Sequence, residues 1–144
     1  LTRAGNENSY AIETGGGCHL RADMIRQKLE RIESESLDYL FIENVGNLVC
    51  PSSYDLGEHL KTAVLSIPEG DEKVRKYPAL FIRSAVVLIN KVDLLGILDY
   101  DIEQVKQDCL AHNPDVQIFE LSAKTGQGFD QWFAFLETQR KKAL

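Results

Sequence analysis

Three short apolar runs place the strongest constraint on how this chain of 144 residues can fold. TAVLSI (62–67), AVVLIN (85–90) and VQIFEL (116–121) have the apolar, β-branched-rich character of strands buried on both faces. Segments with a one-sided apolar stripe predict helices from Leu20 onward, over 101–112 and from Phe129 to Leu136. Strands that alternate with helices predict an α/β domain, a three-layer, mostly parallel sheet with flanking helices.

Two further segments, SYAIET (9–14) and LDYLFIENV (37–45), are also predicted to be strands. The stretches 45–55 and 68–77 are predicted to be mobile loops, and the second is charged and flanked by proline and glycine. Because 144 residues suit one core of useful size, we expect residues 1–144 to form a single domain.

Composition limits the classes of partner that this chain can have. Its 44% hydrophobic and 26% charged content is ordinary for a globular protein, and its formal net charge of −6 argues against a nucleic-acid-binding surface. No apolar run approaches transmembrane length and no signal-peptide pattern is present, so we expect no membrane contact. Three cysteines cannot all pair within one chain, which favours free thiols or metal ligands in a reducing compartment, the cytoplasm.

Asn90, Lys91 and Asp93 form an N-K-x-D sequence directly after the run AVVLIN. Open α/β sheets bind their ligands at the carboxyl ends of the strands. A carboxylate at Asp93 can accept hydrogen bonds from the ring N–H and the exocyclic amine of guanine, a paired donor edge that adenine lacks. The other interpretation is that Asp93 caps the next helix, which is a common role for aspartate. The position after a strand favours base recognition.

Two more elements that follow predicted strands fit the same ligand. Glu43 and Gly46 end the run LDYLFIENVG, where the carboxylate could hold a Mg²⁺-bound water and the glycine N–H could meet a terminal phosphate. Ser122, Ala123 and Lys124 follow VQIFEL, and backbone amides there could reach the guanine carbonyl. Each element alone is also ordinary turn composition. The three in this order predict a site for a guanine nucleotide.

The phosphate half of such a site is not found in this sequence. A phosphate loop has the pattern G-x-x-x-x-G-K-S/T, and none of the ten glycines here is followed by lysine. The glycine run of TGGGCHL (14–20) lacks the lysine, the hydroxyl residue and the spacing, so it is not a phosphate loop.

A metal site is the second interpretation of TGGGCHL. Cys18 and His19 are adjacent, and Cys50 lies just after the acidic-x-x-Gly element; thiolate and imidazole suit Zn²⁺ and Ni²⁺. Three ligands per chain would leave the site open or shared between two copies. A cysteine is also often just a small buried apolar residue, which is the expectation for Cys109 on its helical stripe.

Four segments, in this order, resemble the hydrogenase nickel-incorporation GTPase family, HypB, over nearly the whole chain: ETGGGCHL, LFIENVGNLVCPSSYDLGEH, LINKVDLL and LSAKTGQG. The resemblance implies a P-loop NTPase-like fold of the SIMIBI class, close to the urease accessory GTPases. It implies GTP hydrolysis to GDP and phosphate, coupled to metal binding and to a nucleotide- and metal-dependent homodimer. It also implies delivery of Ni²⁺ to NiFe hydrogenase, with a nickel metallochaperone and the hydrogenase large-subunit precursor as partners.

Matched residue by residue, the resemblance implies three groups of site residues. The metal ligands for Ni²⁺ or Zn²⁺ are Cys18, His19 and Cys50; the catalytic Mg²⁺ and γ-phosphate element is Glu43 and Gly46. The residues that contact the base of GTP or GDP are Asn90, Lys91, Asp93, Ser122, Ala123 and Lys124.

The sequence departs from the family pattern in two respects. The family's phosphate loop belongs to an N-terminal segment, so we expect this chain to be N-terminally truncated and its own GTP hydrolysis to depend on that segment. Asp23 stands where relatives often carry a second histidine, and it could be an extra ligand or a partner of His19. The alternatives to the hydrogenase function are a non-enzymatic nickel- or zinc-binding fragment and a urease-type accessory GTPase.

Overall fold

The structure, a computed structural model, describes residues 9–32 and 37–143. The chain divides into two compact units, Leu1–Gly57 and Glu58–Leu144, and each is considered by itself. The expectation of a single domain over 1–144 stays a prediction.

The second unit is built on a three-stranded parallel sheet of β1 (Thr62–Ser66), β2 (Val86–Asn90) and β3 (Gln117–Leu121) in that order. All three strands were predicted from the apolar runs, and they are confirmed. β2 lies in the middle, and its Val86, Val87 and Ile89 are fully buried, which explains why its run has no polar alternation.

The register of the sheet brings the ends of the strands to one edge. Ser66 pairs with Asn90 and Asn90 pairs with Leu121, so the three strands end side by side. The loops that follow β2 and β3 therefore leave the sheet next to each other.

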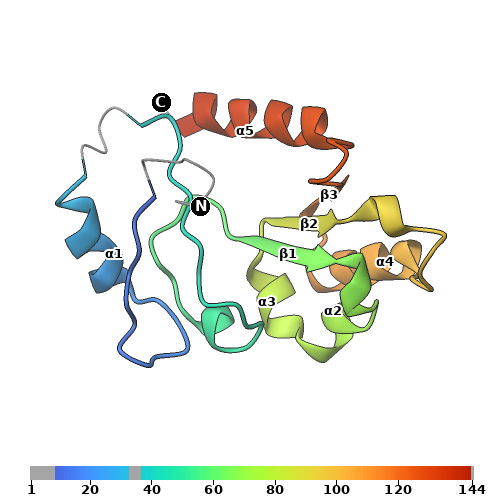
Figure 1. Cartoon of the computed structure of the whole chain (residues 1–144), viewed down its shortest axis with the longest axis horizontal. Coiled ribbons are helices and arrows are strands. Elements are labelled where there is room, and N and C mark those ends of the chain that lie inside the picture. Colours follow the sequence, from blue (N-terminus) through green and yellow to red (C-terminus); the bar gives the residue numbers. More distant parts are fainter. Residues whose placement is uncertain (1–8, 33–36, 144) are drawn as a thin grey trace. The chain divides into compact units, whose positions relative to one another are not determined.

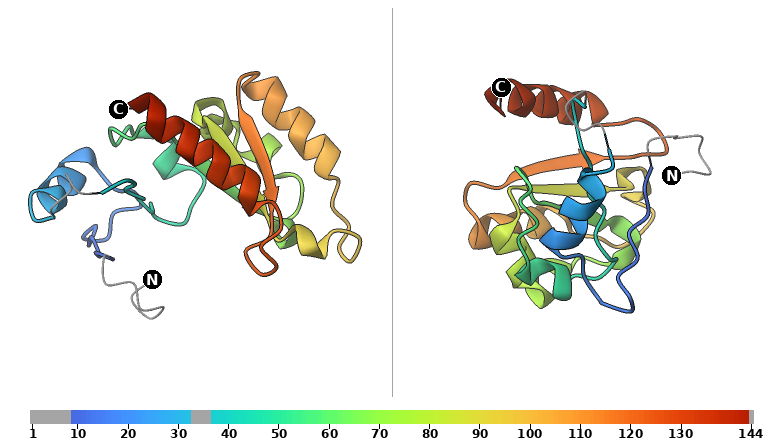
Figure 2. Two further views of the ribbon diagram at one scale, coloured as in Figure 1. Left: turned by 90° about the horizontal axis from the view of Figure 1, so that it is seen from above. Right: turned by 90° about the vertical axis from the view of Figure 1, so that its left-hand side faces the viewer.

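Helices cover both faces of this sheet, as Figures 1 and 2 show. The short helices α2 (Lys73–Lys76) and α3 (Pro78–Arg83) lie with α4 (Ile102–His112) on one face, and α5 (Phe129–Ala143) lies on the other. Trp132 of α5 packs edge-on against Phe119 of β3, with ring centroids 5.4 Å apart. The predicted fold class, an open parallel sheet with flanking helices, is confirmed.

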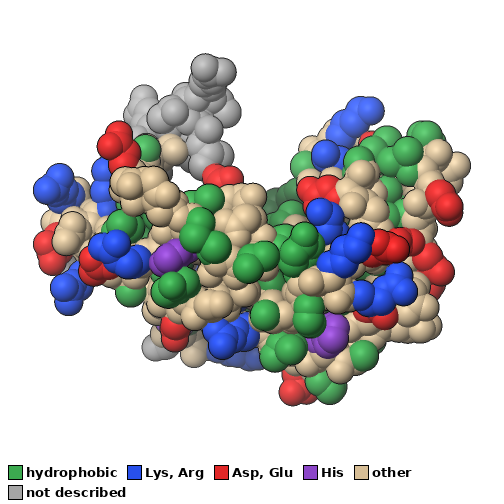
Figure 3. All heavy atoms as spheres, turned by 90° about the horizontal axis from the view of Figure 1, so that it is seen from below, with side chains coloured by type: hydrophobic (Ala, Val, Ile, Leu, Met, Phe, Trp, Pro, Cys, Tyr) green, Lys and Arg blue, Asp and Glu red, His purple; other side chains and the backbone are tan. Residues whose placement is uncertain are grey.

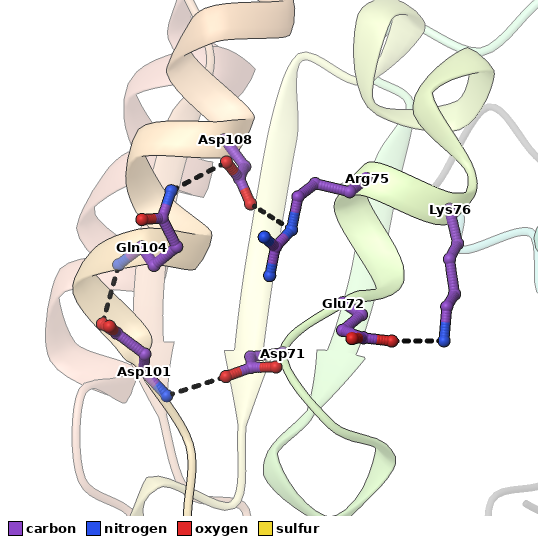
Figure 4. Close-up of polar contacts among 7 residues, drawn as sticks. All are labelled: Asp71, Glu72, Arg75, Lys76, Asp101, Gln104 and Asp108. Carbon is purple, nitrogen blue, oxygen red and sulfur yellow. Dashed lines mark hydrogen bonds and ion pairs between the residues drawn. The ribbon is translucent and has the colours of Figure 1, made fainter.

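Polar contacts join α2 to α4 (Figure 4). Arg75 Nε lies 3.2 Å from the Asp108 carboxylate, which also accepts a hydrogen bond from Gln104 Nε2 at 2.9 Å. Asp101 caps the start of α4 by accepting the Gln104 N–H, as expected for an aspartate at an N-cap. Figure 3, seen from the side of these helices, shows acidic and basic side chains interspersed over this unit.

The first unit has little regular structure in its described part. It contains α1 (Ala22–Leu29) and a 3₁₀ turn at Cys50–Ser53. The helix predicted from Leu20 is confirmed, and it ends before Ile32.

The prediction of strands over 9–14 and 37–45 is wrong, because the residues of both segments form irregular chain without sheet pairing. A strand requires a neighbour for its backbone N–H and C=O groups, and the described sheet pairs only β1, β2 and β3. In keeping with this, Phe41 is 73% exposed although its segment is apolar.

The prediction of a mobile loop over 68–77 is also wrong. The segment contains most of a 3₁₀ turn (Ile67–Glu69) and the helix α2, and Val74 of α2 is fully buried. The charges that suggested a loop make ordered contacts: Glu72 and Lys76 form an ion pair at the surface, and Arg75 pairs with Asp108 of α4. In the described part of the chain, none of the helices has both the length and the apolar character needed to cross a bilayer.

Gly128 fixes the path of the chain after β3. Its φ of +78° lies in the left-handed region, and a Cβ at this position would come within 2.0 Å of the Glu120 carbonyl oxygen. We expect Gly128→Ala to lower the free energy of unfolding by about 3 kcal/mol, since strain and a backbone clash add. Gly96→Ala is the control, because Gly96 has a similar φ of +82° but open space around it. This substitution should lower the free energy of unfolding by about 1 kcal/mol. Urea unfolding measures both, and equal losses would contradict the proposed clash.

Candidate functional site

Asn90 links the two loops that leave the sheet edge. Its Oδ1 accepts the backbone N–H of Lys91 at 2.7 Å and that of Ala123 at 3.1 Å. Lys91 has φ +65°, the one positive φ of a non-glycine residue among those described, and it leads from β2 into a 3₁₀ turn over Val92–Leu94. The sequence-predicted residues of the two loops are thus joined by the asparagine that ends the strand.

Asp93 faces the loop after β3 and does not cap a helix. Ser122 Oγ, fully buried, donates a 2.5 Å hydrogen bond to Asp93 Oδ1. The helix that follows, α4, is capped by Asp101 instead. Because Ser122 holds Oδ1 of the Asp93 carboxylate, its other oxygen, Oδ2, can accept hydrogen bonds from a ligand that presents two adjacent N–H groups.

The loop after β3 is closed by its own backbone. Gly126 N donates to the Ser122 carbonyl at 2.9 Å, and Ser122 N donates to the Gln127 carbonyl at 3.0 Å. Ala123 and Lys124 lie at the exposed tip of this loop, and Lys91 is exposed on the neighbouring loop. The six predicted base-contacting residues therefore occupy the end of β2 and two adjacent loops of one unit, and hydrogen bonds join five of them: Asn90 to Lys91 and Ala123, and Asp93 to Ser122.

The first unit brings together the three predicted metal ligands through contacts that centre on Cys18. Cys18 Sγ lies 3.6 Å from His19 Nδ1. Hydrogen bonding between the Cys50 and Cys18 thiols raises the pKa of Cys50, with a smaller contribution from burial. Thiolates and an imidazole are the donor set that Zn²⁺ and Ni²⁺ accept, so the chemistry of these side chains fits either ion.

These contacts do not form a closed ligand cage. In the ranges 9–32 and 37–143, no group of three or more His, Cys, Asp or Glu side chains is arranged to hold a metal ion. The ring of His19 instead stacks on that of Tyr54, with centroids 3.7 Å apart and planes 8° from parallel. The three residues are neighbours, but His19 faces an aromatic ring as well as Cys18.

Sequence reasoning missed the side chains that hold this arrangement. Asn44 Oδ1 accepts the N–H of Leu20 at 2.9 Å, and Asn47 Nδ2 donates to the Cys18 carbonyl at 2.8 Å. Both asparagines lie in the run LFIENVGNLVCPSSYDLGEH: Asn44 follows Glu43 and Asn47 follows Gly46, the two residues predicted to contact Mg²⁺ and phosphate. Two asparagines in a turn-rich loop were the available signal, since asparagine often bonds to the backbone in such loops.

The remaining predicted residues of the first unit lie on the surface. Glu43 and Gly46 are exposed, and the space around Gly46 is open. Asp23 does not pair with His19: its carboxylate binds the Arg21 guanidinium at 2.9 Å, and this hydrogen bond lowers the pKa of Asp23.

Cys109 has the structural role that its helical stripe indicated. It lies on α4 with 1% of its surface exposed, and burial raises the pKa of its thiol to about 11. It therefore remains protonated and shielded at neutral pH.

Comparison with known proteins agrees with a nucleotide-binding fold. Residues 1–120 match the family model described as "CobW/HypB/UreG, nucleotide-binding domain". The chain therefore belongs to the CobW/HypB/UreG family of nucleotide-binding domains. Within this family its similar relatives are HypB proteins, the hydrogenase maturation factors.

Two curated relatives illustrate the similarity. Hydrogenase maturation factor HypB of Escherichia coli is 48% identical over 96% of this chain and 48% of its own length. Hydrogenase/urease maturation factor HypB of Helicobacter pylori is 39% identical over 94% of this chain and 57% of its own length. The chain thus spans about half the length of the curated relatives it matches.

Two solved structures share the fold. HypB from Archaeoglobus fulgidus matches with a TM-score of 0.84 and 41% identity, covering 94% of this chain and 76% of that one. HypB from Helicobacter pylori, crystallised in complex with nickel, matches with a TM-score of 0.91 and 38% identity, covering 98% of this chain and 67% of that one.

The stack of Tyr54 on His19 can be tested without a metal. Ring currents from a parallel aromatic neighbour at 3.7 Å should shift the His19 ring protons upfield in the NMR spectrum. Tyr54→Leu should return these resonances to ordinary values, whereas Tyr54→Phe should keep the shift because it keeps the ring. Unshifted His19 resonances in the unaltered chain would contradict the stack.

The three cysteines should differ in reactivity. Cys18 is exposed and Cys50 partly exposed, whereas Cys109 is buried. At neutral pH a maleimide should label Cys18 and Cys50 of the folded chain quickly, and Cys109 only in denaturant. Mass spectrometry of tryptic peptides identifies the protected residue, and rapid labelling of Cys109 in the folded chain would contradict its placement.

Proposed function

We propose that this chain is part of a GTP-dependent metallochaperone that inserts Ni²⁺ into NiFe hydrogenase. The observation that carries the proposal is that the Asn47 side chain bonds the Cys18 segment, beside His19, to the turn that carries Cys50, although the sequence places the two segments far apart. A soft ligand set made from two segments of one unit suits a metal that is held and then passed on. The nickel-bound Helicobacter pylori relative supports this choice of ion.

The metal would be cargo. The two thiolates and the imidazole would bind Ni²⁺ or Zn²⁺, and three ligands from one chain leave a position open for a fourth from solvent, a second copy or an acceptor. We infer a homodimer whose formation depends on nucleotide and metal, acting with a nickel metallochaperone and the hydrogenase large-subunit precursor in the cytoplasm.

The nucleotide would be recognised through its base by the loops after β2 and β3. Asp93, oriented by Ser122, would accept the ring N–H and exocyclic amine of guanine, and the Lys91 stem would lie along the base. Backbone N–H groups of the Ala123–Lys124 turn would meet the guanine carbonyl. Asn90 would hold the two loops at the spacing that the base requires.

Hydrolysis of GTP would depend on Glu43 and Gly46. The Glu43 carboxylate would hold a water of the Mg²⁺ ion, and the Gly46 N–H would meet the terminal phosphate. Both are exposed and available to a ligand. The phosphate loop that completes such a site is not in this sequence, so we assign it to the remainder of the intact protein.

A second candidate is a non-enzymatic metal-binding module, and the missing phosphate-loop pattern is the observation in its favour. The two candidates differ in whether nucleotide binds at all. A urease-type role is the third possibility, raised by the relative whose name includes urease maturation.

Asp93→Asn tests the nucleotide half of the proposal. The amide carries an NH2 donor in place of one carboxylate oxygen and has no charge, so the affinity for GDP should fall about a hundredfold, while that for XDP, whose base has a carbonyl in place of the amine, should rise. Calorimetric titration of the intact protein measures both, with the 144-residue chain run alongside.

Asp101→Asn is the matched control, because it makes the same chemical change at the cap of α4, where asparagine also caps well. Its GDP-to-XDP preference should equal that of the unaltered protein. An Asp93→Asn protein that still prefers GDP as strongly would reject guanine recognition by Asp93. An intact protein that binds metal but no nucleotide would favour the non-enzymatic module.

A further inference from the structure

We propose that Asn47 is a positioning residue that holds the Cys18 and Cys50 thiols together through its side-chain amide. The inference deepens the proposed metal site and rests on it for its function. The contacts that support this role of Asn47 all lie within the first unit.

The Asn47 amide bonds to both thiol-bearing segments. Its Oδ1 accepts the backbone N–H of Cys50 at 2.8 Å and that of Val49 at 3.1 Å. Its Nδ2 donates to the backbone carbonyl of Cys18 at 2.8 Å. The acceptor end therefore shapes the turn into Cys50, and the donor end joins that turn to the other segment.

The Cys18 segment depends on bonds to the Cys50 loop, because its other ties are the buried Leu20 and the stack of His19 on Tyr54. Residues 9–20 form no helix or strand, Cys18 is exposed, and Gly15 and Gly16 have open space around them. Local hydrogen bonds between Thr14 and Gly17 shape the turn but do not tie it to the loop with Cys50. Ordering this backbone costs about 1–2 kcal/mol per residue, so bonds between the segments decide whether the thiols stay together.

Asn44 makes a second bond between the same segments but in a different way. Its Oδ1 accepts the N–H groups of Leu20 and of Val45, at 2.9 and 2.8 Å. The two asparagines thus bond to the residues on either side of His19. Asn44 uses only its acceptor end, whereas Asn47 needs both acceptor and donor.

This difference provides a matched pair of variants. Asn47→Asp keeps both acceptor bonds, and so the turn, but cannot donate to Cys18 and sets a carboxylate against its carbonyl. Asn44→Asp adds the same charge to the same loop and keeps both of that residue's hydrogen bonds. If Asn47 acted only by shaping its own loop, Asn47→Asp would keep the two thiols together as well as the unaltered chain does. If the added charge were the cause, both variants would separate the thiols.

The first measurement needs no metal. Dibromobimane becomes fluorescent when its two arms react with two neighbouring thiols, and in the folded chain Cys18 and Cys50 are the accessible pair because Cys109 is buried. We expect the unaltered chain and Asn44→Asp to form the cross-link at similar rates, and Asn47→Asp and Asn47→Ala to do so about tenfold more slowly. Circular dichroism verifies that each variant is folded. Equal rates in Asn47→Asp and Asn44→Asp would overturn the proposal.

The second measurement is titration with Ni²⁺, followed by the thiolate-to-nickel charge-transfer absorption. Asn47→Asp should bind Ni²⁺ about tenfold more weakly than Asn44→Asp, a loss typical of residues that orient metal ligands. Equal affinities for the two variants would overturn a role of Asn47 in metal binding. An unaltered chain that cross-links but shows no such absorption would reject the proposed metal function, while the cross-linking rates would still decide the role of Asn47.

Discussion

The parallel register of β2 with β3 is the constraint on which the nucleotide-facing part of the molecule depends. Because Asn90 pairs with Leu121, the residues that follow each strand emerge together at one edge. That placement lets Ser122 donate to Asp93 and lets Asn90 accept the N–H of Ala123. A shift of one residue would exchange the two buried faces of β2, disrupt the packing on both, and separate these partners, so packing and site geometry are fixed by the same pairing.

The described part of the first unit, residues 9–32 and 37–57, keeps its arrangement without a sheet. Side-chain amides take the place of strand pairing: Asn44 and Asn47 bond to the backbone on both sides of His19, and Tyr54 stacks on its ring. A few hydrogen bonds, each contributing about 1 kcal/mol, hold this part, in contrast to the buried apolar core of the sheet. Such a site can change shape at low energetic cost, which is consistent with the proposed binding and release of a metal.

The sequence predicted the sheet unit well because its strands are continuous apolar runs, and it predicted the residues at their ends because parallel strands place them together. It failed at 9–14 and 37–45, since apolar composition alone does not supply a pairing partner. Ligand chemistry predicted that Cys18, His19 and Cys50 share a metal site, and this stays a prediction. The roles of Asn47 and Tyr54 could not be predicted, because their partners depend on how two irregular segments fold against each other.

The loop from Glu43 to Cys50 carries both the proposed phosphate contact at Gly46 and the proposed metal ligand Cys50, with Asn47 between them. A contact made at Gly46 in the GTP state can therefore move Cys50, and metal affinity and nucleotide state would be coupled reciprocally. The most direct test is calorimetric titration of the intact protein with Ni²⁺ in the presence of GDP and of a non-hydrolysable GTP analogue. The account predicts affinities that differ about tenfold, with the difference reduced in Cys50→Ala. Equal affinities in the two nucleotide states would contradict it.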